Sequence, residues 1–354
     1  MKPSLVPFLR CPASGGALRL VDARTAPGGE EIVAGRLVSD AGREYAVEQG
    51  VPVLLDPDTF APGQAETRAS FSEKWRRAPG YREATKSHYV QWYLERYGHG
   101  DLEGLRRFLL PKRRVLDAGT GHGRDAEMYA TLAPQAAVFG LDLSGGIHLA
   151  YEHLHHLPNL HLVQADLTRL PFAPGFFDFV ACDQVIHHTP DTRRSFAALL
   201  SRLQPGGHVA VYVYKVKGPI REFCDDYIRE RTTRMTPEEC LRFSEAMTKL
   251  GKSLSDLRVE IEVPEDLPLL EIRAGRYDLQ RFLYWNVFKM YWNDGMDWNS
   301  NVITNFDWYH PLHAHRHTPE ELRAWCAEEG LLVEHFDVVE SGISVRARKP
   351  DAIA

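Results

Sequence analysis

The sequence predicts an α/β fold built on a mostly parallel sheet, and two observations support this prediction. Between residues 113 and 215, short apolar runs alternate with helical segments, which is the pattern of βαβ units. The five runs are residues 114–117, 137–141, 160–163, 177–182 and 209–214. The second observation is that a carboxylate ends or follows each of the first four runs: Asp117, Asp142, Asp166 and Asp183. Because parallel strands bind ligands outside their carboxyl ends, we expect a ligand site at this edge.

The first turn at that edge is rich in glycine. Residues 115–126 read VLDAGTGHGRDA, with Gly119, Gly121 and Gly123 after the first strand. A dinucleotide fingerprint needs a glycine at position 124, which is Arg, and a P-loop needs a G-K-[ST] that does not follow. Asp117 would also repel phosphates. We therefore expect a positively charged ligand with a ribose and no phosphate, whose ribose hydroxyls Asp142 would bind.

The motifs at this edge resemble a known family. D-x-G-x-G-x-G at 117–123, FGLDLS around Asp142, the pair at 165–166, FDFVACDQVIHHTPD and LQPGGHVAVYVY occur in the order seen in class I S-adenosylmethionine-dependent methyltransferases. The final LLVEHFDVVESGISVRARK is similar to the antiparallel hairpin that ends that fold. The resemblance implies a Rossmann-like seven-stranded sheet with helices on both faces, and S-adenosylmethionine as cofactor.

The resemblance also implies which residues bind the cofactor. The glycines would lie against its methionine part, Asp142 would hold the ribose, Asp166 and Leu167 would meet the adenine, and Asp183 would line the floor. The full set implied is Asp117, Gly119, Thr120, Gly121, Gly123, Asp142, Leu143, Asp166, Leu167, Asp183 and Gln184.

We expect five parts in the chain. Residues 1–58 form a small β module, 64–112 a helical N-terminal extension, 113–215 the cofactor-binding core, 216–316 an insertion and 317–354 the end of the core. FLRCPASGGALRL and LVSDAGREYAVEQGVPVLL in the first part resemble the zinc-ribbon-like domain that activates several methyltransferases. Only Cys11 is a possible zinc ligand there. Ser14 and Ser39 occupy two positions where further zinc ligands would stand, so we expect no metal. This module would cover one face of the core or form a dimer contact; substrate recruitment is the alternative.

The insertion is too long for an ordinary α/β connection and predicts a subdomain that covers the substrate. Thr236 and Glu239 predict a capped helix that ends before Gly251. A second helix is expected over 276–292, followed by an irregular stretch rich in Asn, Trp, Tyr and His; Thr318 and Glu321 then cap the last helix. The residues that we expect to contact substrate are Tyr214, Tyr284, Trp308, Tyr309, His310 and Arg316.

Histidines suggest the remaining chemistry. His187 and His188 follow the fourth strand, and either would take the proton from an attacking hydroxyl; the alternative is that one packs and the other bonds within the turn. The histidines at 310, 313, 315 and 317 alternate in direction if extended, so no metal is expected there. Aromatic faces at Phe71, Trp75 and Tyr81 are candidates to hold the sulfonium or an acceptor cation.

Composition limits the function. The net charge of −6 argues against a nucleic-acid partner. The five scattered cysteines indicate a reducing compartment, which we take to be the cytoplasm. No apolar run approaches the ~20 residues that a membrane span needs. We expect a monomer or homodimer that methylates a small molecule, on oxygen, with a sugar or secondary metabolite as acceptor. The alternatives are an RNA or protein methyltransferase, and a catalytically inactive regulator that binds the cofactor.

Overall fold

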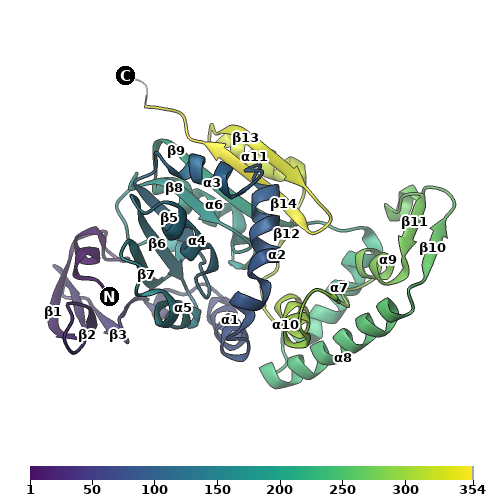
Figure 1. Cartoon of the computed structure of the whole chain (residues 1–354), viewed down its shortest axis with the longest axis horizontal. Coiled ribbons are helices and arrows are strands. Elements are labelled where there is room, and N and C mark those ends of the chain that lie inside the picture. The colour runs from purple at the N-terminus through teal and green to yellow at the C-terminus, as the bar shows by residue number, and fades with distance from the viewer. Residues whose placement is uncertain (353–354) are drawn as a thin grey trace.

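The computed structural model describes residues 1–352, and one twelve-stranded sheet forms the spine of the molecule (Figure 1). Its strand order is β1-β2-β3-β4-β7-β6-β5-β8-β9-β14-β13, with β12 paired to β9. The strands of the core are β5 (Arg114–Ala118), β6 (Ala137–Asp142), β7 (Leu160–Ala165), β8 (Phe177–Cys182), β9 (Leu203–Lys215), β12 (Arg316–His317), β13 (Leu332–Val338) and β14 (Gly342–Arg348). Strands β5 to β9 are parallel, while β14 runs antiparallel to β9 and β13. The predicted α/β fold, including the final hairpin, is confirmed.

Helices cover both faces of the sheet. They are α4 (Arg124–Leu132), α5 (Gly146–Leu154), α6 (Thr192–Ser201) and α11 (Pro319–Glu328). Two hydrophobic cores result because neighbouring strand residues point to opposite faces. Leu116 packs into the core with Phe196 of α6 and Leu322 of α11, whereas Val115 packs into the core with Tyr129 of α4 and Ile147 of α5.

The N-terminal module continues the sheet. Its strands are β1 (Leu18–Thr25), β2 (Ile32–Ser39), β3 (Glu44–Glu48) and β4 (Val51–Leu54), and β4 pairs parallel with β7 through Val53 to Gln164 and Leu54 to Ala165. A tight turn at Gln49 and Gly50, both with positive φ, separates β3 from β4. The module therefore shares a hydrophobic core with the parallel strands.

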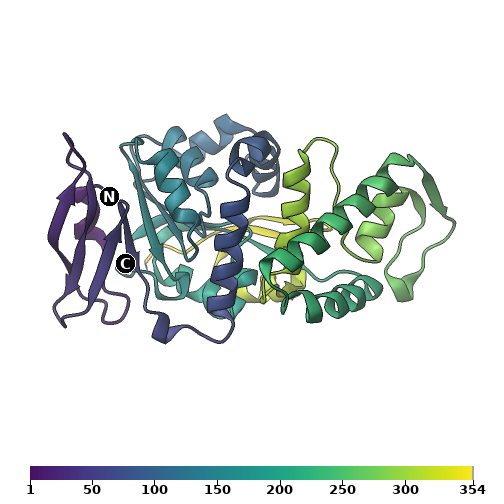
Figure 2. The same ribbon diagram turned by 90° about the horizontal axis from the view of Figure 1, so that it is seen from below.

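The segment before β5 forms three helices, α1 (Gln64–Arg77), α2 (Tyr81–Arg96) and α3 (Leu102–Leu109). The side chain of Asp101 caps α3 by accepting a hydrogen bond from Gly104 N. Helix α1 lies between the parallel sheet and the insertion, where it packs near α5 and near the insertion helix α10 (Trp298–Tyr309) (Figures 1 and 2). Its position brings it over the carboxyl edge of the strands.

The insertion departs from the sequence prediction at three places. It contains α7 (Pro219–Thr232), α8 (Pro237–Asp256), the hairpin β10 (Glu260–Val263) and β11 (Gly275–Asp278), α9 (Leu279–Asn286) and α10. The predicted capping box of α8 is confirmed, but the helix does not end before Gly251, which lies inside it. A Cβ at Gly251 would lie 2.5 Å from the Met290 carbonyl oxygen, so glycine is needed there for close packing.

The second helix expected over 276–292 was also wrong. Residues 275–278 form a strand, the helix covers only α9, and the stretch predicted to be irregular contains the twelve-residue α10. Buried amides explain the difference. Asn301 and Asn305 of α10 accept hydrogen bonds from the backbone N–H groups of Asn293 and Tyr291, at 2.7 Å and 2.8 Å. These contacts fix the preceding loop on the helix, which local periodicity does not reveal. The capping box of Thr318 and Glu321 is confirmed.

Within the described residues, no helix has both the length and the hydropathy that a membrane crossing requires.

Candidate functional site

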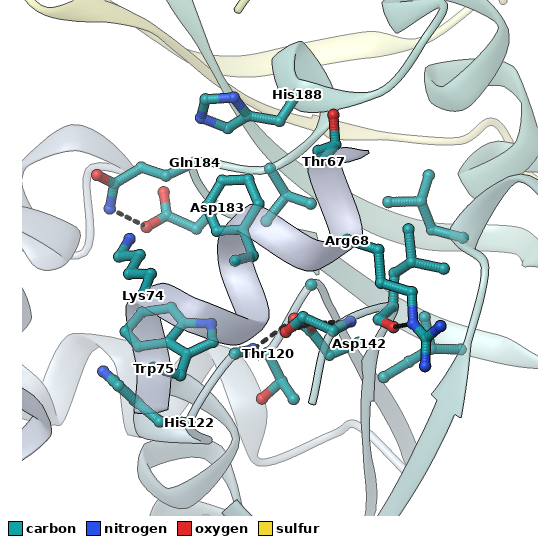
Figure 3. Close-up of a pocket in the computed structure, with 18 of the residues that line it drawn as sticks. Thr67, Arg68, Lys74, Trp75, Thr120, His122, Asp142, Asp183, Gln184 and His188 are labelled. Atoms are coloured by element: carbon teal, nitrogen blue, oxygen red, sulfur yellow. Dashed lines mark hydrogen bonds between the residues drawn. The ribbon is translucent and has the colours of Figure 1, made fainter. Parts of the chain in front are cut away.

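A cavity opens at the carboxyl edge of the parallel strands, under α1 (Figure 3). Ten of the eleven residues expected to bind cofactor line it: Asp117, Gly119, Thr120, Gly121, Asp142, Leu143, Asp166, Leu167, Asp183 and Gln184. Gly123 is the exception. A Cβ at Gly123 would lie 2.6 Å from Leu154 Cδ1, so this glycine allows α4 to pack against α5 and does not line the cavity.

The glycine turn brings bare backbone to the cavity wall. Gly119 and Gly121 have φ values of +85° and +56°. A Cβ at Gly119 would lie 2.3 Å from Val185 Cγ2, and one at Gly121 would lie 2.8 Å from Trp75 Cζ2. Both positions therefore require glycine for conformation and for space. The turn forms a cradle in which a ligand can approach the main chain closely.

Asp142 is held rigidly at the end of β6. Its Oδ2 accepts a hydrogen bond from Gly121 N at 2.7 Å, and its Oδ1 accepts from Ser144 N at 2.7 Å and Ser144 Oγ at 2.6 Å. Burial raises the pKa of Asp142, while these hydrogen bonds act against the rise. These bonds occupy three of the about four acceptor positions of an ionised carboxylate, so Oδ2 keeps one position that can accept from a ligand hydroxyl.

Asp166, at the end of β7, is fixed from two sides. Its Oδ2 accepts from Gln64 Nε2 of α1 at 2.8 Å and from Thr168 Oγ1 at 2.8 Å, and its Oδ1 accepts from Thr168 N at 2.8 Å. Ala165, the residue before Asp166, pairs with Leu54 of β4. The N-terminal module and α1 therefore both support this end of the cavity.

The opposite end contains buried charge. Asp183 Oδ1 accepts a hydrogen bond from Tyr97 OH at 2.8 Å and lies 3.0 Å from Arg96 Nη1, and both partners come from the end of α2. The next residue, Gln184, has a φ of +59°, which is uncommon for a residue with a side chain. Burial, with Asp125 as the second cause, raises the pKa of Asp117 well above its usual range.

Comparisons with known proteins agree with this geometry. Residues 116–211 match a family model described as a methyltransferase domain. This segment is a class I S-adenosylmethionine-dependent methyltransferase domain. The matched segment runs from within β5 to within β9. Most of the residues that line the cavity lie in this segment.

Curated relatives match part of the chain. Identity is 31% over 173 residues to an uncharacterized protein of Synechococcus sp., covering 48% of this chain and 37% of that one. It is 31% over 131 residues to the phthiotriol/phenolphthiotriol dimycocerosates methyltransferase of Mycobacterium leprae, covering 37% and 48%. It is 38% over 108 residues to the trans-aconitate 2-methyltransferase of Deinococcus radiodurans, covering 30% and 40%. The chain spans less than half the length of each of these relatives.

The cavity of the methyltransferase domain suits S-adenosylmethionine. Asp142 Oδ2 offers one free acceptor position for a ribose hydroxyl, and the glycine cradle leaves room for the methionine chain against the backbone. The aromatic face of Trp75 and the carboxylates of the wall favour a sulfonium charge. The residues present therefore fit this cofactor.

The two adjacent histidines have different surroundings. His188 lines the cavity, and its Nδ1 lies 2.7 Å from the carbonyl oxygen of His313. Since a carbonyl only accepts, Nδ1 carries the proton, and in the neutral ring Nε2 keeps its lone pair. Burial lowers the pKa of His188 to about 4, although Asp307 acts against this shift. His188 is therefore neutral at physiological pH and able to accept a proton.

His187 does not line the cavity. It is fully buried, and its ring centroid lies 3.8 Å from that of Tyr214. Burial, followed by the charge of His188, lowers the pKa of His187 well below its usual range. Of the two histidines predicted as bases, the structure places only His188 where a ligand can reach it.

The six residues expected to contact substrate lie in the insertion and around its junction, outside the cavity lining. Tyr214 packs between His187 and Trp308 behind His188, while Tyr284 and Tyr309 belong to the hydrophobic core of the insertion. The other two residues, His310 and Arg316, connect neighbouring elements through polar contacts. His310 Nδ1 lies 2.7 Å from Ser70 Oγ of α1, and Arg316 pairs with Glu222 at 3.0 Å.

Sequence reasoning missed the polar residues that α1 and α10 bring to the cavity. Lys74 of α1 pairs with Asp307 of α10 in its wall, and Gln64 of α1 also lines the cavity. Thr67 and Arg68 lie on the same helix as Lys74 (Figure 3). No local signal marks these residues, because α1 and α10 are far apart in the sequence. The predicted aromatic residues Phe71, Trp75 and Tyr81 do line the cavity.

Within residues 1–352, no three or more His, Cys, Asp or Glu side chains are grouped so that they would hold a metal ion.

Proposed function

We propose that this chain transfers the methyl group of S-adenosylmethionine to an oxygen atom of a small molecule. The main support is the cavity itself: the cofactor residues of the methyltransferase domain and His188 lie in one wall, and α1 and α10 close the other. Two curated relatives are named as methyltransferases of phthiotriol/phenolphthiotriol dimycocerosates and of trans-aconitate, which supports a small-molecule acceptor. The side chains that α1 and α10 place over the cavity suit a small molecule better than a polymer.

The roles of the residues follow from their positions. Asp142 and Asp166 hold the nucleoside part of the cofactor, and the glycine turn holds its methionine part. The cofactor supplies a methyl group on a positively charged sulfur, which becomes a neutral thioether once the methyl group has left. His188 takes the proton of the acceptor hydroxyl at Nε2, since Nδ1 is engaged by the His313 carbonyl. Catalysis depends mainly on alignment, for which effective molarities reach ~10⁵–10⁸ M.

The first test is cofactor binding. Calorimetry with S-adenosylmethionine and S-adenosylhomocysteine is expected to give saturable binding to the wild type. Asp142→Ala should weaken it at least tenfold, because the side chain that holds both the ribose and Gly121 N is removed. Asp40→Ala, at an exposed turn, is the matched control and should bind normally. Failure of the wild type to bind at millimolar cofactor would end the proposal.

The second test is turnover. Screening a metabolite library for a mass gain of one methylene unit should identify acceptors that carry a hydroxyl group. His188→Asn should then lower kcat by ~10²–10⁴-fold with little change in cofactor affinity, as expected for loss of a general base. Turnover of amines alone, with an active His188→Asn variant, would contradict oxygen as the acceptor atom.

A further inference from the structure

The acceptor end of the cavity combines aromatic rings with a single lysine, and its chemistry indicates a substrate class. This inference rests on the proposed function. Apart from the residues assigned to the cofactor, the wall contains rings from α1 and α2, the Lys74 and Asp307 pair, and His188. It also contains Thr67, Arg68, His122, Arg124, Asp125, Thr189 and Pro190. The rings are Phe71, Trp75, Tyr81 and Tyr89.

The rings surround one space. Trp75 and Tyr81 lie with ring centroids 6.1 Å apart and their planes at 62°, and Phe71 lies 4.9 Å from His188 at 67°. Such edge-to-face walls present both ring faces and ring edges to a ligand. Aromatic ligands gain about 0.5–1.5 kcal/mol per ring pair beyond their area burial.

Lys74 brings its ammonium group into this space. The Nζ atom lies 4.3 Å from the Trp75 ring centroid, 5.3 Å from Phe71 and 5.9 Å from Tyr81, and the side chain is 10% exposed. Its one carboxylate partner is Asp307, at 3.1 Å. A cation held among rings with little water stabilises an oxyanion far more strongly than it would in bulk solvent.

The charges that face Lys74 come from several elements. Asp307 lies on α10, Asp142 at the end of β6, His188 on the 3₁₀ turn after β8, His122 in the glycine turn, and Lys289 before α10. The two aspartates are the carboxylates of this group, and the buried histidines are neutral. Arg124, another cation of the cavity wall, is paired with Asp125 at 2.8 Å. An ionised oxygen beside the Lys74 ammonium would be attracted to it.

The weak basicity of His188 also favours an acidic hydroxyl group as the acceptor. With its pKa lowered to about 4, His188 is a weak base, and a weak base removes a proton slowly from an aliphatic alcohol. A phenol releases its proton much more readily, near the pKa of ~10 of tyrosine, and Lys74 would stabilise the resulting phenolate.

We propose that the acceptor is an aromatic compound with an ionisable ring hydroxyl, held against Phe71 and Trp75 with its oxygen beside the ammonium of Lys74. The hydroxyl proton passes to His188 Nε2 or to water as the phenolate forms. The oxygen then supplies the electron pair of the new carbon–oxygen bond, and the carbon–sulfur bond breaks with its electron pair left on sulfur. The balance needs no other reactant.

The test is a binding titration with 4-nitrophenol, whose phenolate absorbs at a longer wavelength than the phenol. With S-adenosylhomocysteine present, the wild type should bind the probe and lower its apparent pKa by about one unit or more. Lys74→Met should abolish the shift and weaken binding at least tenfold, whereas Lys74→Arg should retain most of the shift. Lys252→Met, which removes an exposed lysine of α8, should behave as wild type.

Two further measurements make every outcome decisive. 4-Nitrobenzyl alcohol and methyl glucoside should bind at least tenfold more weakly than 4-nitrophenol, so the comparison stands even if Lys74→Met fails to fold. The proposal is overturned if bound 4-nitrophenol titrates as it does in solution, or if the alcohol and the glucoside bind equally well. Calorimetry separates the two hypotheses: cofactor binding without probe binding rejects the aromatic acceptor alone, whereas absence of cofactor binding rejects the methyltransferase function.

Discussion

Lys74 Nζ of α1 lies 3.1 Å from Asp307 Oδ1 of α10, so an ion pair joins the N-terminal extension to the insertion across the cavity. A second contact, between Ser70 Oγ and His310 Nδ1 at 2.7 Å, joins the same two helices. Helix α1 is thereby held over the carboxyl edge of the sheet. The site of the methyltransferase domain is completed by two segments that lie outside that domain.

The ion pair is expected to couple α1 and α10 energetically. Lys74→Met and Asp307→Asn should each lower the free energy of unfolding by about 1–3 kcal/mol, because each leaves the partner's charge in a mostly buried wall. The double variant should lose clearly less than the sum of the two single losses. Urea unfolding of all four proteins measures this cycle, and strictly additive losses would show that the pair contributes nothing.

Gly119 should be intolerant of a side chain. Its φ of +85° makes Gly119→Ala cost about 1–2 kcal/mol from conformation alone. The clash of the new Cβ with Val185 adds to this loss and narrows the cofactor cradle. Gly29→Ala is the matched control, since Gly29 has open space around its Cβ position and should change stability by less than about 0.5 kcal/mol. Thermal melts and cofactor calorimetry measure these effects. Equal stability and equal cofactor affinity of the two variants would contradict the requirement for glycine at position 119.

Acid should destabilise the fold partly through His188. Its folded-state pKa of about 4 lies below the ordinary value of 6.5, so between these values the unfolded chain binds more protons than the folded chain. Stability therefore falls as the pH drops from about 6.5 to 4. His188→Asn should lose less stability over this window, by on the order of 1–3 kcal/mol. Unfolding free energies across the window measure this difference, with the exposed His156→Asn as control. Parallel curves for wild type and His188→Asn would refute the assignment.

The N-terminal module should be indispensable for folding. Strand β4 covers the edge of β7, and Leu37, Tyr45 and Leu54 share a hydrophobic core with Val163 and other residues of the parallel strands. Deleting residues 1–55 would expose this core and leave an unpaired strand edge, which promotes aggregation. Light scattering after size exclusion should therefore show aggregated material. A truncated chain that is monodisperse and binds cofactor would show that the module is an independent accessory.

The oligomeric state, the location in the cytoplasm and the zinc-ribbon origin of the N-terminal module stay predictions. The five cysteines, all within residues 1–352, are free thiols. Analytical ultracentrifugation would decide between monomer and homodimer.

The sequence by itself determined the features whose causes are local. Apolar runs that alternate with helices predicted the parallel strands, the carboxylates at their ends located the cofactor edge, and Thr236 with Glu239 marked the start of α8. Each of these signals spans a few residues, so it can be recognised without knowledge of the rest of the chain.

Tertiary structure decided the features that depend on distant partners. The pairing of Val53 with Gln164 made one sheet of two expected modules, and the buried amides of Asn301 and Asn305 stabilised a helix where the pattern indicated an irregular chain. It also brought Lys74 to Asp307 and turned His187 into the core. These contacts join residues that local patterns do not relate, because burial and charge pairing depend on where the chain returns in space.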